Sequence, residues 1–222
     1  MLIEDNSVAD EIYHAYFSYS LLRYVTSRKN LFSAFSSSFV IYFVHELVGC
    51  KKKMEYNREL LDKMPEKEEE YKNSAFIVGD SVERRVLELL NAKTPFLAFK
   101  ILDPSKNIVI VGSADGWYDN RPLEIKYRTS SCAPDDSHIL QARIYAWLYG
   151  VDYSWLIVVS PKCIKSYKAY AVSETELKHL IEHWPSPRFA GECMFCPFAT
   201  KCPYANAKTS TLISYVVDKS TT

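Results

Sequence analysis

Two acidic residues and a lysine lie close together in a central segment that has the pattern of paired β-strands. One predicted strand ends at Asp115, and the next contains Glu124 and Lys126. Side chains repeat every two residues along a strand, so Glu124 and Lys126 share a face. If the two strands pair antiparallel, Asp115 lies beside Glu124, and two carboxylates meet next to an ammonium group.

This set of side chains suits a hard divalent cation. Mg²⁺ takes one or two carboxylates, keeps several waters and binds phosphate oxygens. Such a metal would acidify an attacking water and neutralise charge on a phosphodiester, and Lys126 would orient that water. The alternative is an ordinary cross-strand ion pair at the surface, formed by Lys126 with Glu124 or Asp115.

Further polar residues flank this group on predicted helices. Gln141 and Tyr145 are four residues apart, so they lie on one face of the helix that follows the Glu124 strand. Upstream, Glu83 lies near the start of another predicted helix. It is either a further acid of the metal site or a solvated helix residue.

The order of a helix, an aspartate, a Glu-x-Lys strand and a Gln-x-x-x-Tyr helix resembles the RecB-like branch of the PD-(D/E)xK nucleases. The resemblance covers roughly residues 79–145. It implies that Asp115 and Glu124 bind metal, that Lys126 is the catalytic lysine, and that Gln141 and Tyr145 contact nucleic acid or support the site. We expect the metal site to consist of Glu83, Asp115, Glu124 and Ile125. The branch usually has histidine at the position of Glu83, so this chain departs from the pattern there.

Three cysteines cluster near the end of the chain, with the spacing Cys193-x₂-Cys196-x₅-Cys202. Three thiolates leave a tetrahedral centre one ligand short. One interpretation is a zinc ion with His179 or His183 as the fourth ligand.

The other interpretation of these cysteines comes from the family resemblance. In RecB-like nucleases with an iron–sulphur cluster, a further cysteine precedes the nuclease core, and Cys50, followed by three lysines, occupies that place. The arrangement resembles the CRISPR-associated RecB-like exonucleases and the AddB nuclease domain. It implies a [4Fe–4S] cluster held by Cys50, Cys193, Cys196 and Cys202. We expect Cys132 and Cys163 to be unliganded thiols.

The composition excludes several classes of protein. The 222 residues include 27 Lys plus Arg and 27 Asp plus Glu, so nucleic-acid binding requires a local basic patch. That patch has several candidates, each of which is otherwise a solvated helix residue: Lys51 to Lys53, Arg58, Arg84, Arg85, Arg128 and Arg143. The six glycines form neither a P-loop nor a dinucleotide-binding fingerprint. We read no signal peptide and no membrane-spanning run, and expect a cytoplasmic protein.

Hydrophobic periodicity and turn residues predict an α/β fold. We expect a RecB-like core over residues 76–185, with a mixed central sheet flanked by helices. Residues 1–75 are predicted to be helical, including 18–24 and 38–61, and residues 186–222 to form an iron–sulphur module. Within the core, we expect helices from Asp80 to Leu90, from Ser137 to Tyr149 and from Ser173 to about Trp184. The expected strands are 96–102, 108–117, 122–128, 153–160 and 166–172.

The resemblance implies a Mg²⁺- or Mn²⁺-dependent exonuclease that acts on single-stranded DNA or DNA ends. It further implies a role in CRISPR adaptation, trimming DNA before integration, with integrase proteins as possible partners. One alternative is a DNA-binding adaptor of the same fold without catalysis. Another is a virus- or plasmid-borne relative in recombination or counter-CRISPR activity. The sequence does not indicate the oligomeric state.

Overall fold

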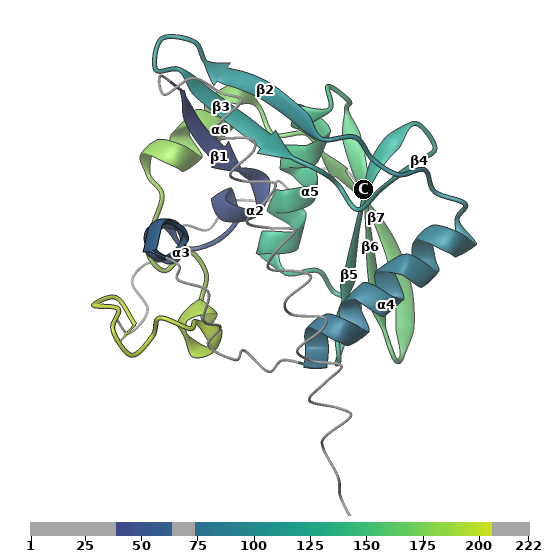
Figure 1. Ribbon diagram of the computed structural model, residues 1–222. Helices are drawn as coiled ribbons and strands as arrows, with labels where there is room; N and C mark the ends of the chain where they lie inside the picture. Colours follow the sequence, from purple (N-terminus) through teal and green to yellow (C-terminus); the bar gives the residue numbers. More distant parts are fainter. Residues whose placement is uncertain (1–38, 64–73, 206–222) are drawn as a thin grey trace, which may run out of the picture.

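The computed structural model describes residues 39–63 and 74–205. These residues form a mixed α/β fold, as the sequence predicts, but two β-sheets with a helix between them replace the single central sheet that was expected (Figure 1). The smaller sheet has the strand order β1-β3-β2. Its strands are β1 (Val40–Phe43), β3 (Ile108–Gly112) and β2 (Ala98–Asp103). β1 runs parallel to β3, whereas β2 and β3 pair antiparallel.

The larger sheet has the strand order β4-β5-β6-β7. Its strands are β4 (Gly116–Tyr118), β5 (Arg121–Tyr127), β6 (Tyr153–Ser160) and β7 (Cys163–Tyr170). β5 and β6 are parallel because the chain crosses between them through helix α5 (Asp136–Leu148), and the other pairs are antiparallel.

Helix α5 packs between the two sheets and supplies much of the core. Its Ala142 packs with Leu156 and Val158 of β6, and its Ile144 and Tyr145 belong to the core cluster on the side of the smaller sheet. Helix α4 (Ser74–Leu89) packs on β5, and the side chain of its Leu87 lies directly over Gly116. Two helices therefore flank the strand that carries Glu124 and Lys126.

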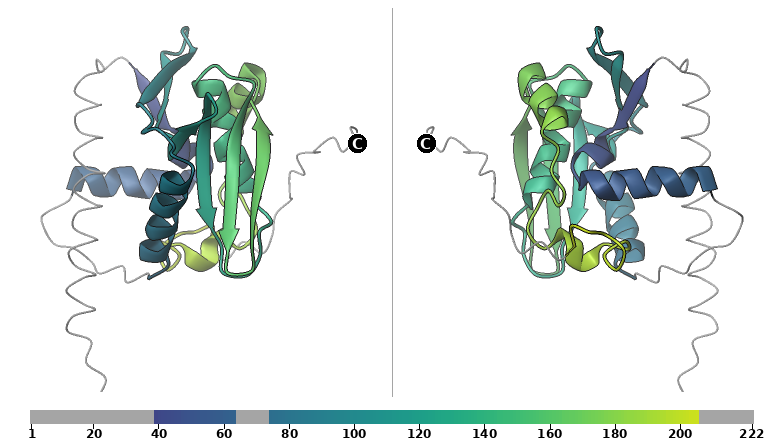
Figure 2. Two further views of the ribbon diagram at one scale, coloured as in Figure 1. Left: turned by 90° about the vertical axis from the view of Figure 1, so that its right-hand side faces the viewer. Right: turned by 90° about the vertical axis from the view of Figure 1, so that its left-hand side faces the viewer.

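The described residues include four further helices outside the two sheets. They are α2 (Val44–Leu47), α3 (Lys51–Lys63), α6 (Glu174–Glu182) and the 3₁₀ helix η1 (Glu192–Phe195). The segment that follows α6 returns to the start of α3 (Figure 2). No helix within the described ranges is long and apolar enough to cross a membrane.

Most predicted elements are confirmed, with shifted ends. β6 has the predicted bounds, and Ser173 accepts a hydrogen bond from Glu176 N as the N-cap of α6. Three predictions are wrong. The single strand predicted over 108–117 divides between the two sheets at residues 113–115. The strand expected from Ser166 to Val172 begins at Cys163, and α4 begins at Ser74 rather than at Asp80, whose carboxylate pairs with Arg84 inside the helix.

The N-terminal prediction requires a further correction. The helical period over residues 38–61 includes Val40–Phe43, which is a strand, because pairing with β3 buries the side chains of Ile41 and Phe43. The helix predicted over residues 18–24 lies outside the described residues.

Candidate active site and cysteine cavity

Backbone pairing brings Asp115 next to Glu124. Asp115 precedes β4, and its N–H donates to Leu123 O at 3.0 Å, which extends the antiparallel pairing of β4 with β5. Its Oδ2 accepts a hydrogen bond from Ile125 N at 2.7 Å. The carboxylate of Asp115 is therefore fixed against the strand that carries Glu124.

Glu124 is fully buried and has too few partners for a carboxylate. Its exposed fraction is 0%; Oε1 pairs with Lys126 Nζ at 2.5 Å, and Oε2 accepts no hydrogen bond from the described residues. Burial, and then repulsion from Asp115, raise the pKa of Glu124 to about 8. Because Glu124 is fully buried, its pair with Lys126 is not the ordinary surface ion pair that was the alternative interpretation.

Two carboxyl groups and one ammonium group share this buried space. Burial raises the pKa of Asp115, against the opposing effects of Lys126 and the Ile125 N–H. Burial lowers the pKa of Lys126, but Glu124 and Asp115 outweigh it, and the pKa of Lys126 is raised overall. Lys126 therefore stays protonated at neutral pH.

Helix α5 contributes two of the predicted residues. Gln141 Nε2 donates to Tyr145 Oη at 3.5 Å, and Tyr145 is buried. The pKa of the Tyr145 phenol is raised well above its ordinary value by burial and then by Glu124, which indicates that the ring lies near the carboxylates. Gly112 of β3 leaves room for the Tyr145 ring, because a side chain at this position would place its Cβ only 2.9 Å from Tyr145 Cε1.

The remaining predicted metal residues lie on the two elements around Glu124. Glu83 is on α4, and its charge raises the pKa values of both Glu124 and Lys126. Ile125 lies between Glu124 and Lys126 on β5, and its side chain is buried.

Sequence reasoning missed His138, which also lies near Lys126. Burial, and then the charge of Lys126, lower the pKa of His138 to about 4, so the imidazole is neutral at pH 7. Its Nδ1 accepts a hydrogen bond from Asp135 N at 3.3 Å. The available signal was its spacing, because His138, Gln141 and Tyr145 follow one face of α5 at intervals of three and four residues.

The Asp115 and Glu124 carboxylates fit a divalent cation. Oε1 of Glu124 is satisfied by Lys126, but Oε2 is buried and accepts no hydrogen bond from the described residues, which is costly unless a further cation or a proton satisfies it. Within residues 39–63 and 74–205, no three His, Cys, Asp or Glu side chains are grouped to hold a metal ion. Mg²⁺ needs no such group, because waters and substrate phosphates complete its shell.

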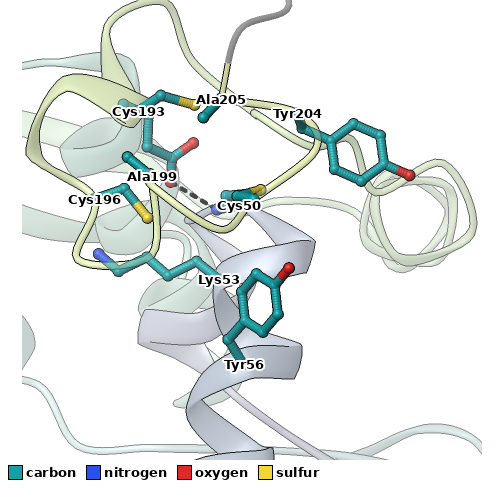
Figure 3. Close-up of a pocket in the computed structure, with 10 residues that line it drawn as sticks. Cys50, Lys53, Tyr56, Cys193, Cys196, Ala199, Tyr204 and Ala205 are labelled. Carbon is teal, nitrogen blue, oxygen red and sulfur yellow. Dashed lines mark hydrogen bonds between the residues drawn. The ribbon is translucent and has the colours of Figure 1, made fainter.

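The four cysteines of the predicted cluster line one cavity (Figure 3). Cys50 directly precedes α3. The other three, Cys193, Cys196 and Cys202, lie in the C-terminal segment. Burial, and then the neighbouring Cys50, Cys196 and Cys202, raise the pKa of the Cys193 thiol. His179 and His183 are not among the residues that line the cavity, and their rings lie 4.4 Å apart at the end of α6.

Hydrogen bonds from the C-terminal segment hold the start of α3 at this cavity. Cys50 N donates to Glu192 Oε1 at 2.7 Å, Lys51 N to Pro185 O at 3.3 Å, and Lys52 N to Ser186 Oγ at 2.9 Å. These N–H groups have no partner within a helix, because the first turn of a helix lacks preceding carbonyls. Thiols are the preferred ligands of soft metal centres, and four of them from distant parts of the chain line this cavity, although within the described residues no three of them are grouped closely enough to hold a metal ion.

The prediction for the other two cysteines is wrong. Cys132 and Cys163 form a disulfide, which joins the loop after β5 to the start of β7. Their sequence separation of 31 residues gave no indication of the pairing. The strand order brings them together, because Ser160 at the end of β6 pairs with Cys163.

The arginines predicted as candidates for phosphate binding are occupied by acidic partners. The pairs are Arg58–Glu46, Arg84–Asp80, Arg85–Glu88, Arg128–Asp135 and Arg143–Glu176. Glu46 is buried, so its pair with Arg58 ties α3 to α2. This pairing favours a structural role for these arginines.

Two comparisons with known proteins found similar chains. The chain is 28% identical over 177 residues to the CRISPR-associated exonuclease Cas4 of Saccharolobus solfataricus, an alignment that covers 72% of this chain and 86% of that protein. The chain is a homologue of an exonuclease. The crystal structure of SSO0001 superimposes with a TM-score of 0.61 at 23% identity, covering 84% of this chain and 98% of that one. The two share a fold. No protein family profile matches the chain.

Proposed function

We propose that this protein is a metal-dependent DNA exonuclease whose active site contains Asp115, Glu124 and Lys126. The observation that carries the proposal is Glu124, a fully buried carboxylate whose Oε1 pairs with Lys126, whose Oε2 accepts no hydrogen bond from the described residues, and which lies beside a second carboxylate. Perturbed, buried titratable groups of this kind are typical of catalytic sites. Homology to a CRISPR-associated exonuclease supports the same chemistry.

Asp115, Glu124 and the backbone of Ile125 would hold Mg²⁺ or Mn²⁺, with Glu83 nearby. Such a metal supplies an acidified water and neutralises charge on the phosphodiester. Lys126 keeps its proton, because the two carboxylates raise its pKa, so Nζ orients the attacking water and offsets charge on the phosphate as a donor. Gln141 and Tyr145 support the site from α5.

The cysteine cavity would hold a [4Fe–4S] cluster through Cys50, Cys193, Cys196 and Cys202. Four thiolates are the usual ligands of such a cluster, and it would join the α3 region to the C-terminal segment. Zinc is the competing occupant. The visible spectrum and iron content of anaerobically purified protein distinguish them, because zinc gives no visible absorbance.

The substrate would be single-stranded DNA or DNA ends, and the cellular role would be trimming of DNA in the cytoplasm before CRISPR integration, next to integrase proteins. Cleavage of 5′-labelled single strands and duplexes, measured with Mg²⁺, Mn²⁺ or EDTA, tests the activity. We expect metal-dependent shortening from an end. Binding of DNA without cleavage under any of these conditions would refute the proposal in favour of a non-catalytic adaptor.

A further inference from the structure

Three aromatic rings from separate elements pack together beside the candidate active site. Phe96 precedes β2, Trp117 lies on β4, and Tyr149 follows α5. The ring centroids of Phe96 lie 5.9 Å from Trp117 and 5.0 Å from Tyr149, and those of Trp117 and Tyr149 lie 5.3 Å apart. We call these three residues the aromatic cluster.

The hydroxyl group of Tyr149 links the cluster to the backbone next to Asp115. Tyr149 Oη donates to Phe96 O at 2.6 Å and accepts from Ala114 N at 3.3 Å, and Ala114 directly precedes Asp115. Trp117 lies opposite Pro122 in the β4–β5 pairing, and Pro122 shares its face of β5 with Glu124, two residues further along the strand. The rings therefore continue the active-site face of the strand.

The exposure of these rings differs from that of a core cluster. Trp117 and Tyr149 are half-buried, but Phe96 is 63% exposed although it contacts both. The exposed Lys93 adjoins the cluster, because Lys93 and Trp117 exchange two backbone hydrogen bonds of 2.9 Å. An open aromatic face with a cation beside it matches the chemistry of a base and its phosphate.

We propose that the aromatic cluster, with Phe96 as its outer ring, stacks an unpaired nucleobase of the DNA strand whose phosphate enters the Asp115–Glu124 site. This inference rests on the proposed function and specifies its substrate. A base in a duplex already stacks on its neighbours, so only a single strand or a frayed end can offer its face. Lys93 then lies where the adjacent phosphate passes.

The test compares Phe96→Ala with Phe99→Ala, both in the Lys126→Ala background, in which we expect DNA to be bound and its cleavage to be at least about a hundredfold slower. Phe99 is the matched control, because it is also 63% exposed and lies opposite Val111 in the β2–β3 pairing. Fluorescence anisotropy measures the Kd for a labelled oligo(dT) single strand and for a blunt duplex of equal length.

We expect Phe96→Ala to raise the single-strand Kd about tenfold, as loss of one stacked base does, with little change for the duplex. Phe96→Trp should restore binding, and Phe99→Ala should leave both affinities unchanged. Equal single-strand affinity for Phe96→Ala and the background protein, or equal weakening by Phe99→Ala, would overturn the proposal.

A second measurement requires no change at Phe96, so it holds if that variant does not fold. Oligo(dT) should quench part of the tryptophan fluorescence, and Trp117→Phe should remove that part. No difference in quenching between the two proteins would refute stacking on the cluster. The failures are distinguishable, because quenching without cleavage by the unaltered chain contradicts the nuclease, whereas cleavage without quenching contradicts only the stacking site.

Discussion

Glu192 holds the two halves of the cysteine cavity together, and its replacement gives a measurable prediction. Its carboxylate accepts backbone hydrogen bonds from Cys50 at 2.7 Å, Arg188 at 3.0 Å and Phe189 at 3.4 Å. The first of these spans 142 residues of sequence. Glu192→Ala removes all three acceptor contacts and leaves the N–H of the buried Cys50 without a partner.

The size of the effect follows from these contacts. An orphaned buried N–H costs about 1–3 kcal/mol, and hydrogen bonds to a charged group contribute about 1.5–3 kcal/mol each, although water replaces the more exposed ones. We therefore expect Glu192→Ala to lower the free energy of unfolding by about 2–4 kcal/mol. For a domain of this size, the melting temperature falls by about 5–15 °C.

Thermal unfolding of metal-free protein, followed by circular dichroism, measures this loss without any contribution from a bound cluster. Glu59→Ala is the control, because Glu59 is an exposed carboxylate on the same α3 helix and its loss should change the melting temperature by about 2 °C or less. Equal melting temperatures for Glu192→Ala and the unaltered protein would refute the claim that these hydrogen bonds join the two segments.

Three further predictions concern the buried site and the cross-links. Because the pKa of Glu124 is raised to about 8, the folded metal-free protein holds a proton that the unfolded chain loses near pH 4.5. Its melting temperature should therefore fall from pH 6.5 to 8, above the range in which the lowered pKa of His138 has the opposite effect, and a flat profile there would contradict the assignment. Cys50→Ser should abolish visible absorbance, whereas Cys132→Ser should keep it and lose about 3–4 kcal/mol of stability under oxidising conditions, as measured by denaturant unfolding. Gly112→Ala should cost about 1–3 kcal/mol by colliding with α2 and α5 side chains, whereas Gly79→Ala, with open space around it, should not destabilise.

The sequence predicted the strand that carries Glu124 and Lys126 well, because its signals are local. The two-residue period placed Glu124 and Lys126 on one face, and the antiparallel turn brought Asp115 beside them. The four-residue spacing likewise placed Gln141 near Tyr145. Each of these relations follows from backbone geometry within a few residues.

Relations across long sequence separations were harder to predict. Residues Val40–Phe43 continue a helical hydrophobic period, and only pairing with β3 makes them a strand. The disulfide of Cys132 with Cys163 depends on the order of strands in the larger sheet. The aromatic cluster was missed for the same reason, because Phe96, Trp117 and Tyr149 meet only when three elements pack.

The most direct test of the central claim is the initial rate of single-strand DNA cleavage by purified protein and by Lys126→Ala, in Mg²⁺ or Mn²⁺ and in EDTA. In the proposed mechanism the two carboxylates and the lysine act on one transition state, so we expect a metal-dependent rate that falls at least about a hundredfold in Lys126→Ala. The Kd for DNA should change little. An equal rate in the variant, or a rate that persists in EDTA, would contradict the account of this site.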